Sequence, residues 1–206
     1  MTLFEVGVSI AVVMILSAVL LPMLATARKR ASHINCVNCL KQIGLSYRIW
    51  EGDNHDIYPM GVSVTNGGSM EMVATGNVIQ TFQVMSNELS TPRILICPMD
   101  AARVAANNFG GLANVNLSYF IGVDVTNGTN PQMIISGDSN FEIGGVPVRP
   151  GLCQFWTNDP VAWTAARHVK AGNIGLADGS VQAVTAKGLR DYLQQTGLAT
   201  NRLAIP

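Results

Sequence analysis

The chain has 206 residues, a formal net charge of zero and only 13% charged residues, which is enough for one folded domain plus a long helix. Five basic residues and no acid occur between Arg28 and Arg48, whereas twelve acids and eight bases follow from Glu51 onward. The later part has no clustered basic face, which argues against a nucleic-acid-binding protein. A balanced, weakly charged surface is instead suited to dense packing between copies of the chain.

The first predicted element is a long apolar helix. No charged side chain occurs between Val6 and Ala27, and Arg28, Lys29 and Arg30 then end the run. A run of this length spans the roughly 30 Å hydrocarbon core of a bilayer. It lacks the basic segment and the small-residue cleavage site of a secretory signal, so we expect it to be retained.

Glu5, at the start of this run, is the strongest candidate for a functional residue. A carboxylate at the edge of a membrane helix is costly and usually has a partner, which a neighbouring N-terminal amine would supply. The alternative is an acid that simply reaches the aqueous interface beside the N-terminus.

The apolar helix is interrupted by Pro22 and is predicted to continue well beyond the membrane. Proline removes the hydrogen bond to residue 18, so we expect a kink or local melting in an assembled state. Apolar residues then repeat with helical spacing to about Trp50, which predicts a helix of roughly 70 Å at 1.5 Å per residue.

This continuation carries two apolar faces, which predicts two packing partners. One face is expected to pack on the chain's own sheet, and the second on neighbouring subunits. The alternative is a helix buried on most sides within one domain. The first face comprises Cys36, Cys39, Leu40, Ile43, Tyr47 and Trp50, and the second comprises Ile34, Val37, Leu45 and Ile49.

Short elements follow, and they predict an α+β fold in which the long N-terminal helix packs on a C-terminal antiparallel sheet. Asp178-Gly179 is typical of a two-residue hairpin turn. The expected division is a transmembrane helix over 1–27, an amphipathic continuation over 28–52 and a β-rich globular domain over 53–206. Helices are expected over 77–89 and 185–195, and strands over 93–97, 116–123, 133–136, 146–148, 173–177 and 180–184.

Four cysteines follow the apolar helix, in what would be an oxidising compartment, and they allow three disulfide pairings. The Cys36-x-x-Cys39 spacing also permits buried thiols or a metal site. No second metal-type cluster accompanies it in the sequence, since Cys97 and Cys153 are isolated. Disulfides are therefore the favoured interpretation.

His168 and Asp178 could suggest acid–base chemistry. The sequence has no nucleophile with an obvious base and no glycine-rich phosphate loop, so we expect no enzyme, no cofactor and no metal. A structural role is favoured for both residues. The remaining alternative is a calcium site, because oxygen ligands suit that cation. Its ligands would be Asp138, Asn140, Glu142 and Asp178.

Several segments of the sequence together resemble a known family. Met1-Thr-Leu-Phe-Glu5, followed by an apolar helix containing Pro22, resembles the mature N-terminus of the type IV pilin and pseudopilin superfamily. His168, nine residues and then Asp178-Gly179 reproduce the H-x9-DG element of a bacterial group of pilin-like proteins. The segment 32–45 resembles the Cys-x-Asn-Asn-Leu-Lys-Gln-Ile-Gly stretch of that group, and Cys97-Pro98 resembles its Cys-Pro pair.

The resemblance implies how such a chain matures. In that family a prepilin peptidase removes a short basic leader, the new N-terminus is usually methylated, and residues equivalent to Glu5 and Pro22 recur. Such a leader would set the membrane orientation, which Arg28–Arg30 alone would set the opposite way by the positive-inside rule. Glu5 would pair with the α-amine of a neighbour's Met1, and Cys36 would pair with Cys97, leaving Cys39 with Cys153.

The implied function is that of a structural pilin. It would be held in the inner membrane and then polymerise through its N-terminal helix, with residues 1–27 in the filament core, into a type IV pilus-like filament at the cell surface. Its partners would be other copies of itself, the membrane, the prepilin peptidase and the pilus assembly machinery, with no specific nucleic acid. The alternatives are a minor pilin or type II secretion pseudopilin and, in another class, a monomeric membrane-anchored binding or hydrolytic module.

Overall fold

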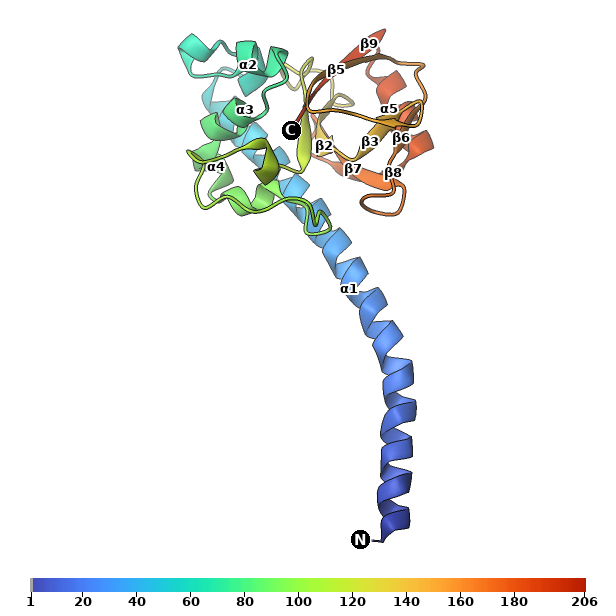
Figure 1. The fold of residues 1–206 in the computed structure, drawn as a ribbon. Coiled ribbons are helices and arrows are strands. Elements are labelled where there is room, and N and C mark those ends of the chain that lie inside the picture. The colour runs from blue at the N-terminus through green and yellow to red at the C-terminus, as the bar shows by residue number, and fades with distance from the viewer. Residues whose placement is uncertain (1) are drawn as a thin grey trace. The chain divides into compact units, whose positions relative to one another are not determined.

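The computed structural model describes residues 2–206, which form two compact units. The first unit ends at Ile34, and the second comprises Asn35–Pro206. The long N-terminal helix is confirmed as α1 (Leu3–Asp53), which begins in the first unit and ends in the second (Figure 1). The sequence-based boundaries at residues 27 and 52 lie where the composition of the chain changes. The boundary after Ile34 instead separates two groups of residues that make most of their contacts within their own group.

The second unit contains short helices and nine strands within residues 35–206. Its α-helices after α1 are α2 (Met70–Ala74), α3 (Ile79–Val84), α4 (Ser86–Leu89) and α5 (Ala186–Gln195). Short 3-10 helices cover Pro59–Gly61, Val64–Asn66, Pro92–Leu95 and Asn114–Asn116. The strands are β1 (Tyr119–Gly122), β2 (Ile134–Asp138), β3 (Phe141–Ile143), β4 (Val146–Pro147), β5 (Gly151–Trp156), β6 (Val161–Trp163), β7 (Ala171–Leu176), β8 (Val181–Thr185) and β9 (Thr200–Ile205).

The strands form two antiparallel sheets, which confirms the α+β class. The larger sheet has the order β5-β9-β1-β2-β7-β8, and the smaller has the order β4-β3-β6. The C-terminal strand β9 pairs with β5 on one side and β1 on the other, so the end of the chain lies inside the large sheet. In Figure 1, α2, α3 and α4 gather on one side of this unit and the strands on the other.

Side chains on the two faces of the large sheet enter two different hydrophobic cores. Successive residues of a strand point to opposite faces. Tyr119 and Ile121 therefore join the core that includes the buried stripe of α1, whereas Phe120 joins the second core. The second core also contains Leu189 of α5 and Trp163 of β6. The large sheet is thus covered on both faces, by α1 on one and by α5 with the small sheet on the other.

Two predicted elements differ from the structure, and the strands β3, β5, β6 and β9 lie outside the predicted ranges. The strand expected over 93–97 is wrong, because Pro92 begins a 3-10 helix and the Thr91 side chain accepts a hydrogen bond from the Arg93 amide. The helix expected over 77–89 divides into α3 and α4. The side chain of Asn77 nevertheless accepts a hydrogen bond from the Ile79 amide.

The predicted hairpin at Asp178-Gly179 forms between β7 and β8, with a turn one residue longer than expected. Leu176 and Ser180 close the turn, since the Leu176 amide donates to the Ser180 carbonyl over 2.9 Å. Gly179 has a φ of 84°, in the left-handed region that suits glycine in three-residue hairpin loops. The Asp178 carboxylate accepts a bond from the Ser180 amide, which explains the residue as turn chemistry.

Two glycines of β7 provide a matched test of this packing. A Cβ at Gly172 would lie 2.5 Å from the Trp163 ring, whereas at Gly175 the nearest atom would be the Ser136 carbonyl oxygen at 3.6 Å. We expect Gly172→Ala to lower the free energy of unfolding by about 1–3 kcal/mol through overpacking. Gly175→Ala should be neutral or stabilising by less than about 1 kcal/mol. Urea unfolding of the detergent-solubilised chain measures both, and equal effects would contradict this packing.

Candidate functional site

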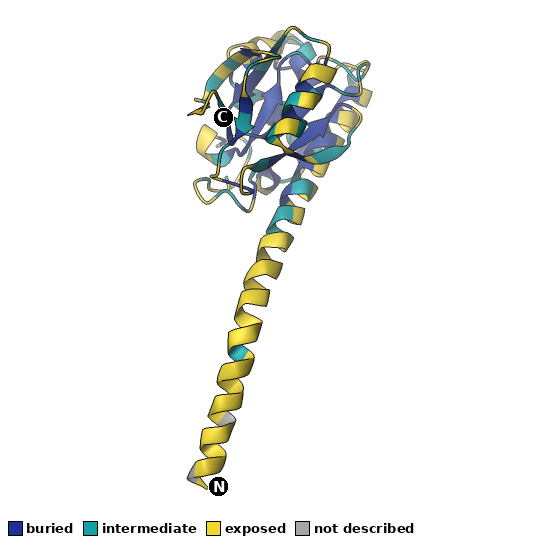
Figure 2. Ribbon diagram, turned by 90° about the vertical axis from the view of Figure 1, so that its right-hand side faces the viewer, coloured by how far each residue is buried: buried dark blue, intermediate teal, exposed yellow. Residues whose placement is uncertain are grey.

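The first unit is an isolated helical segment with an exposed apolar surface. Almost every described side chain from Phe4 to Leu24 is exposed, with only Ser17 partly covered (Figure 2). This helix is long and apolar enough to cross a membrane. Exposed apolar surface of this extent marks a site that a membrane or a protein partner covers.

Glu5 has a local partner in the first turn of this helix. The Thr2 backbone amide donates to Glu5 Oε2 over 2.7 Å, and the Glu5 amide donates to Thr2 Oγ1 over 3.3 Å. This reciprocal arrangement is a capping box, which satisfies two backbone donors that the start of a helix leaves unpaired. Met1 lies outside the described residues, so its pairing with Glu5 of a neighbouring chain stays a prediction.

Pro22 lies within α1, which is continuous from Leu3 to Asp53. Proline has no amide hydrogen for the Ala18 carbonyl, and two hydroxyls flank this weak point. Ser17 Oγ donates to the Val13 carbonyl over 2.7 Å, and Thr26 Oγ1 donates to the Pro22 carbonyl over 3.0 Å. The melting predicted at Pro22 concerns an assembled filament and stays a prediction.

The two faces of the continuing helix have different exposure. On the first face, Cys39 is half-buried, and the rest are buried in the core shared with the large sheet. These residues are Cys36, Leu40, Ile43, Tyr47 and Trp50. On the second face, Ile34, Leu45 and Ile49 are exposed at 58%, 59% and 46%, and Val37 is half-buried. The contact of this second face with other subunits stays a prediction.

A disulfide joins Cys36 of α1 to Cys97, which confirms that pairing. Closing a loop of 61 residues contributes about 4 kcal/mol in the chain-entropy treatment. The predicted Cys39–Cys153 pairing is wrong, because both residues are free thiols. Cys39 packs against the core that contains α1, whereas Cys153 on β5 packs against the second core.

The environments of these two thiols also make them poor nucleophiles. Burial raises the pKa of the Cys39 thiol, an effect that a hydrogen bond with Tyr119 partly offsets. Burial likewise raises the pKa of the Cys153 thiol. Since the thiolate is the reactive form, a raised pKa lowers the reactivity of both thiols at neutral pH.

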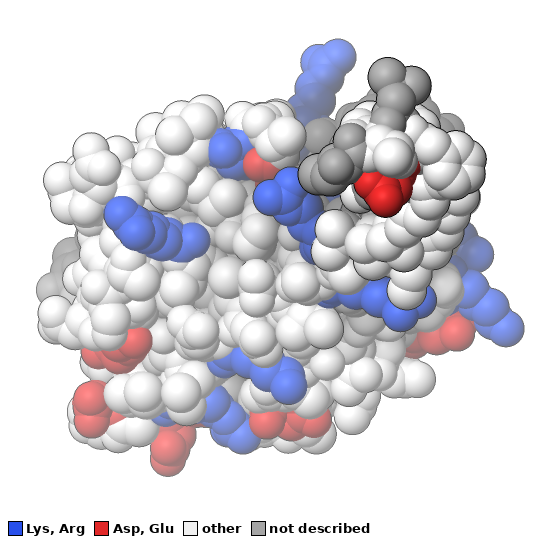
Figure 3. Space-filling view, turned by 90° about the horizontal axis from the view of Figure 1, so that it is seen from below, with Lys and Arg blue, Asp and Glu red and all other residues white. Residues whose placement is uncertain are grey.

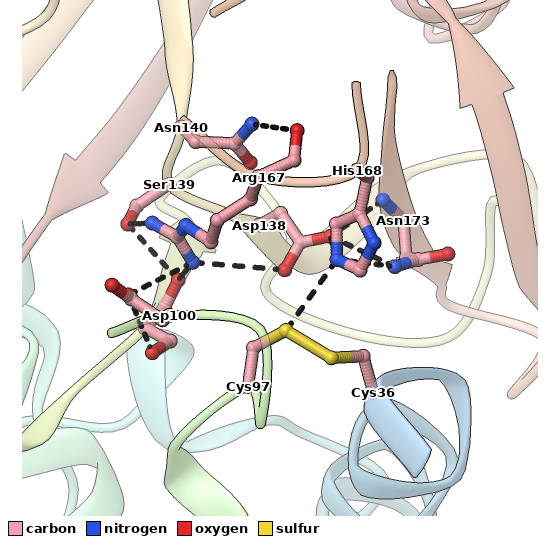
Figure 4. The surroundings of a disulfide bond; sticks show 10 residues. Cys36, Cys97, Asp100, Asp138, Ser139, Asn140, Arg167, His168 and Asn173 are labelled. Carbon is pink, nitrogen blue, oxygen red and sulfur yellow. Dashed lines mark hydrogen bonds and ion pairs between the residues drawn. A yellow bond between two sulfur atoms is a disulfide. The ribbon is translucent and has the colours of Figure 1, made fainter. Parts of the chain in front are cut away.

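Beside the disulfide lies a buried polar centre organised around Asp138 (Figure 4). Asp138 ends β2 and is completely buried. Its Oδ2 accepts hydrogen bonds from the backbone and the side-chain amide of Asn173 on β7, over 2.8 and 2.9 Å. His168 Nε2 lies 3.4 Å from the same oxygen. A buried carboxylate requires such compensation.

His168 connects this centre to the disulfide. Its Nε2 lies 3.4 Å from Cys97 Sγ, and its side chain is only 1% exposed. The predicted structural role of His168 is therefore supported by direct contacts, from β2 and β7 to the cysteine that is bonded to α1. The histidine ligand atom and the two sulfur atoms lie within 4.8 Å of one another, which is the only such metal-type group among the described residues.

Arg167 supplies the positive charge of the centre. One guanidinium nitrogen, Nη1, lies 3.2 Å from Asp100 Oδ2 and 3.8 Å from Asp138 Oδ1. The same nitrogen donates to the Ser118 carbonyl over 3.0 Å, and Nη2 donates to Ser139 Oγ over 2.8 Å. The two carboxylates and the two neutral oxygen acceptors therefore engage both terminal nitrogens of the buried guanidinium group.

The segment that carries His168 has an unusual backbone. His168, Val169 and Lys170 have φ values of 50°, 52° and 61°, in the left-handed region that non-glycine residues rarely adopt. Such strain persists only where the surroundings determine the conformation. Here the buried contacts of Arg167 and His168 fix the start of this segment, whereas the Val169 side chain is 87% exposed.

The alternative calcium site is not assembled. Asp138 lies beside Asn173 in the middle of the unit, whereas Asp178 is exposed in the turn after β7. Residues 173 and 178 are five apart along the β7 hairpin arm, or roughly 16 Å in extended chain. Asp138 is also already engaged with Asn173 and Arg167.

Sequence reasoning missed Asp100, Arg167 and Asn173, and it weighed Asp138 only for calcium. The available signal was an acid and an amide inside otherwise apolar strand segments, Ile134–Asp138 and Ala171–Leu176. Asp and Asn are depleted in strands, so their presence in buried ones points to a mutual contact.

Comparison of this chain with protein-family models, with curated proteins and with solved structures finds no match. The structure therefore identifies the class of this protein as an α+β domain that has a long apolar N-terminal helix and a buried polar centre beside a disulfide.

Substitutions in two arginine–aspartate pairs test how much this polar centre contributes to the free energy of unfolding. We expect Arg167→Ala to lower the free energy of unfolding by about 3–5 kcal/mol, because it leaves buried carboxylates uncompensated. Arg202 binds Asp124 over 2.8 Å, but its side chain is 42% exposed, so Arg202→Ala should cost less than about 1 kcal/mol. Chemical unfolding of both variants measures the difference. A loss at position 167 no larger than that at 202 would contradict the assignment.

Proposed function

We propose that this chain is a structural subunit that polymerises through α1 into a type IV pilus-like filament. The observation that carries the proposal is the combination on one helix of an exposed apolar segment, an acid in its first turn and a second apolar face from Ile34 to Ile49. A membrane covers the first segment before assembly, and other copies of α1 cover both surfaces afterwards. A monomeric anchored module leaves the second face uncovered.

The surface of the chain is compatible with close packing of many copies. On the face drawn in Figure 3, charged side chains are sparse, of both signs and scattered among uncharged ones. The formal net charge is zero. Copies with these properties approach without strong long-range repulsion.

The proposal includes the partners and the location that the sequence resemblance implies. The subunit would be processed by a prepilin peptidase, held in the inner membrane and transferred by an assembly machinery to a filament at the cell surface. Electron microscopy of sheared surface material, with antibodies against residues 53–206, tests this directly. Filaments that bind the antibody support it, and a chain found only in membranes as a monomer refutes it.

Glu5 has two roles that can be separated by substitution. Glutamine at position 5 keeps the side-chain acceptor of the capping box but removes the charge that a neighbour's N-terminal amine would pair with. We therefore expect Glu5→Gln to reduce sheared filament at least tenfold while the membrane-inserted pool remains. Thr2→Ala removes the hydroxyl of the same capping box but keeps the charge, so its filament yield should fall much less. The reverse order would show that helix capping, not charge pairing, explains the need for Glu5.

The two faces of α1 provide a second test. Leu45 is 59% exposed and Ile43 is completely buried, so a charge has different consequences at the two positions. Leu45→Asp should change the free energy of unfolding by less than about 0.5 kcal/mol. It should nevertheless block assembly, because it places an unpaired charge between subunits. Ile43→Asp should unfold the second unit. Thermal melts beside filament yields measure both, and a folded Ile43→Asp chain with an unfolded Leu45→Asp chain would reverse the faces.

A further inference from the structure

We infer that the reduced form of this chain binds one Zn²⁺ between Cys36, Cys97 and His168, with Asp138 as the fourth ligand. The zinc would occupy the place of the disulfide as an alternative cross-link between α1 and the large sheet. This inference concerns the polar centre alone and is independent of polymerisation.

The spacing of the ligand atoms fits tetrahedral zinc. Typical Zn–S and Zn–N bonds of about 2.3 and 2.0 Å place sulfur and nitrogen ligands about 3.5 Å apart, and nitrogen and oxygen ligands about 3.4 Å apart. His168 Nε2 lies 3.4 Å from Cys97 Sγ and 3.4 Å from Asp138 Oδ2. The ligand atoms of Cys36, Cys97 and His168 lie within 4.8 Å of one another, and the Asp138 carboxylate lies outside that group. Binding therefore requires the two sulfur atoms to separate to about 3.8 Å once their bond is broken, and the Asp138 carboxylate to move toward them.

The chemistry of the ligands and of their surroundings also fits zinc. Two cysteines, a histidine and a carboxylate are ordinary zinc ligands, and all four are buried here. Two thiolates, Asp138 and Asp100 carry four negative charges. These are balanced by Zn²⁺, Arg167 and Arg103, whose Nε lies 3.9 Å from Asp100. The Asp138 carboxylate is already oriented by Asn173, as the ligands of structural metal sites are.

The exchange of the disulfide for zinc requires a dithiol reductant and Zn²⁺. A dithiol reductant gives two electrons and two protons to the Cys36–Cys97 bond, which yields two thiols and an oxidised dithiol. Zn²⁺ then displaces both thiol protons. In the reverse direction a small-molecule disulfide accepts the two electrons of the thiolates and takes up two protons, so that the Cys36–Cys97 bond re-forms, the oxidant leaves as two thiols and Zn²⁺ is released.

The test uses the full-length chain in detergent, with Cys39→Ser and Cys153→Ser so that only the two relevant thiols remain. It is reduced with a dithiol, freed of reductant without oxygen, and titrated with Zn²⁺ and, separately, with Co²⁺. We expect one metal ion per reduced chain, fewer than about 0.1 per oxidised chain, and a tetrahedral cobalt spectrum with sulfur-to-metal charge transfer. Adding His168→Gln should weaken binding at least tenfold.

Each alternative result is informative. A reduced chain that binds no metal overturns the inference, and so does equal affinity in the His168→Gln chain. If the reduced chain is unfolded without metal, far-ultraviolet circular dichroism follows the titration, and recovery of structure at one Zn²⁺ per chain supports the site. A chain that stays unfolded in excess Zn²⁺ overturns it.

Discussion

The burial of the Asp138 carboxylate is the constraint on which the second unit depends. The carboxylate ends β2, and it is stabilised there by Asn173 of β7 and by Arg167 and His168 of the loop that precedes β7. His168 in turn contacts the sulfur of Cys97, which is bonded to α1. One buried charge therefore connects the sheet, a strained loop and the long helix. Removing any one contact leaves others unsatisfied, as is usual for buried polar networks.

The parts of the fold with strong local periodicity could be predicted from sequence. The helix to residue 53, the buried stripe from Cys36 to Trp50 and the β7–β8 hairpin all follow from spacing or turn residues. The strands β3, β5, β6 and β9 were missed. β3 and β6 have three residues each, which is too few to show a pattern, and β5 and β9 gain their places by pairing with each other and, for β9, with β1. The polar centre was missed for a related reason. Asp138 and Asn173 are adjacent only across the sheet, which no spacing along the chain reveals.

The two cysteine outcomes illustrate the same limit. The pairing of Cys36 with Cys97 came from resemblance, and the structure has that bond. The pairing of Cys39 with Cys153 came from elimination, which treats the remaining cysteines as if they were free to meet. The large sheet separates them, since Cys39 belongs to the side of α1 and Cys153 to the side of the second core. Assigning a disulfide by elimination therefore fails when a sheet divides the interior into two compartments.

The capping box at the start of α1 has a consequence for how an acid can enter an apolar phase. The Thr2 amide already donates to the Glu5 carboxylate, so the acid carries part of its solvation shell with it when water is removed. An incoming cation then has to replace only the remaining water, and the barrier to dehydration falls accordingly. The same amide would otherwise be an unpaired donor at the helix end. The Glu5 carboxylate and the Thr2 amide are each costly to bury in an apolar medium, and the hydrogen bond between them lowers the cost of burying both.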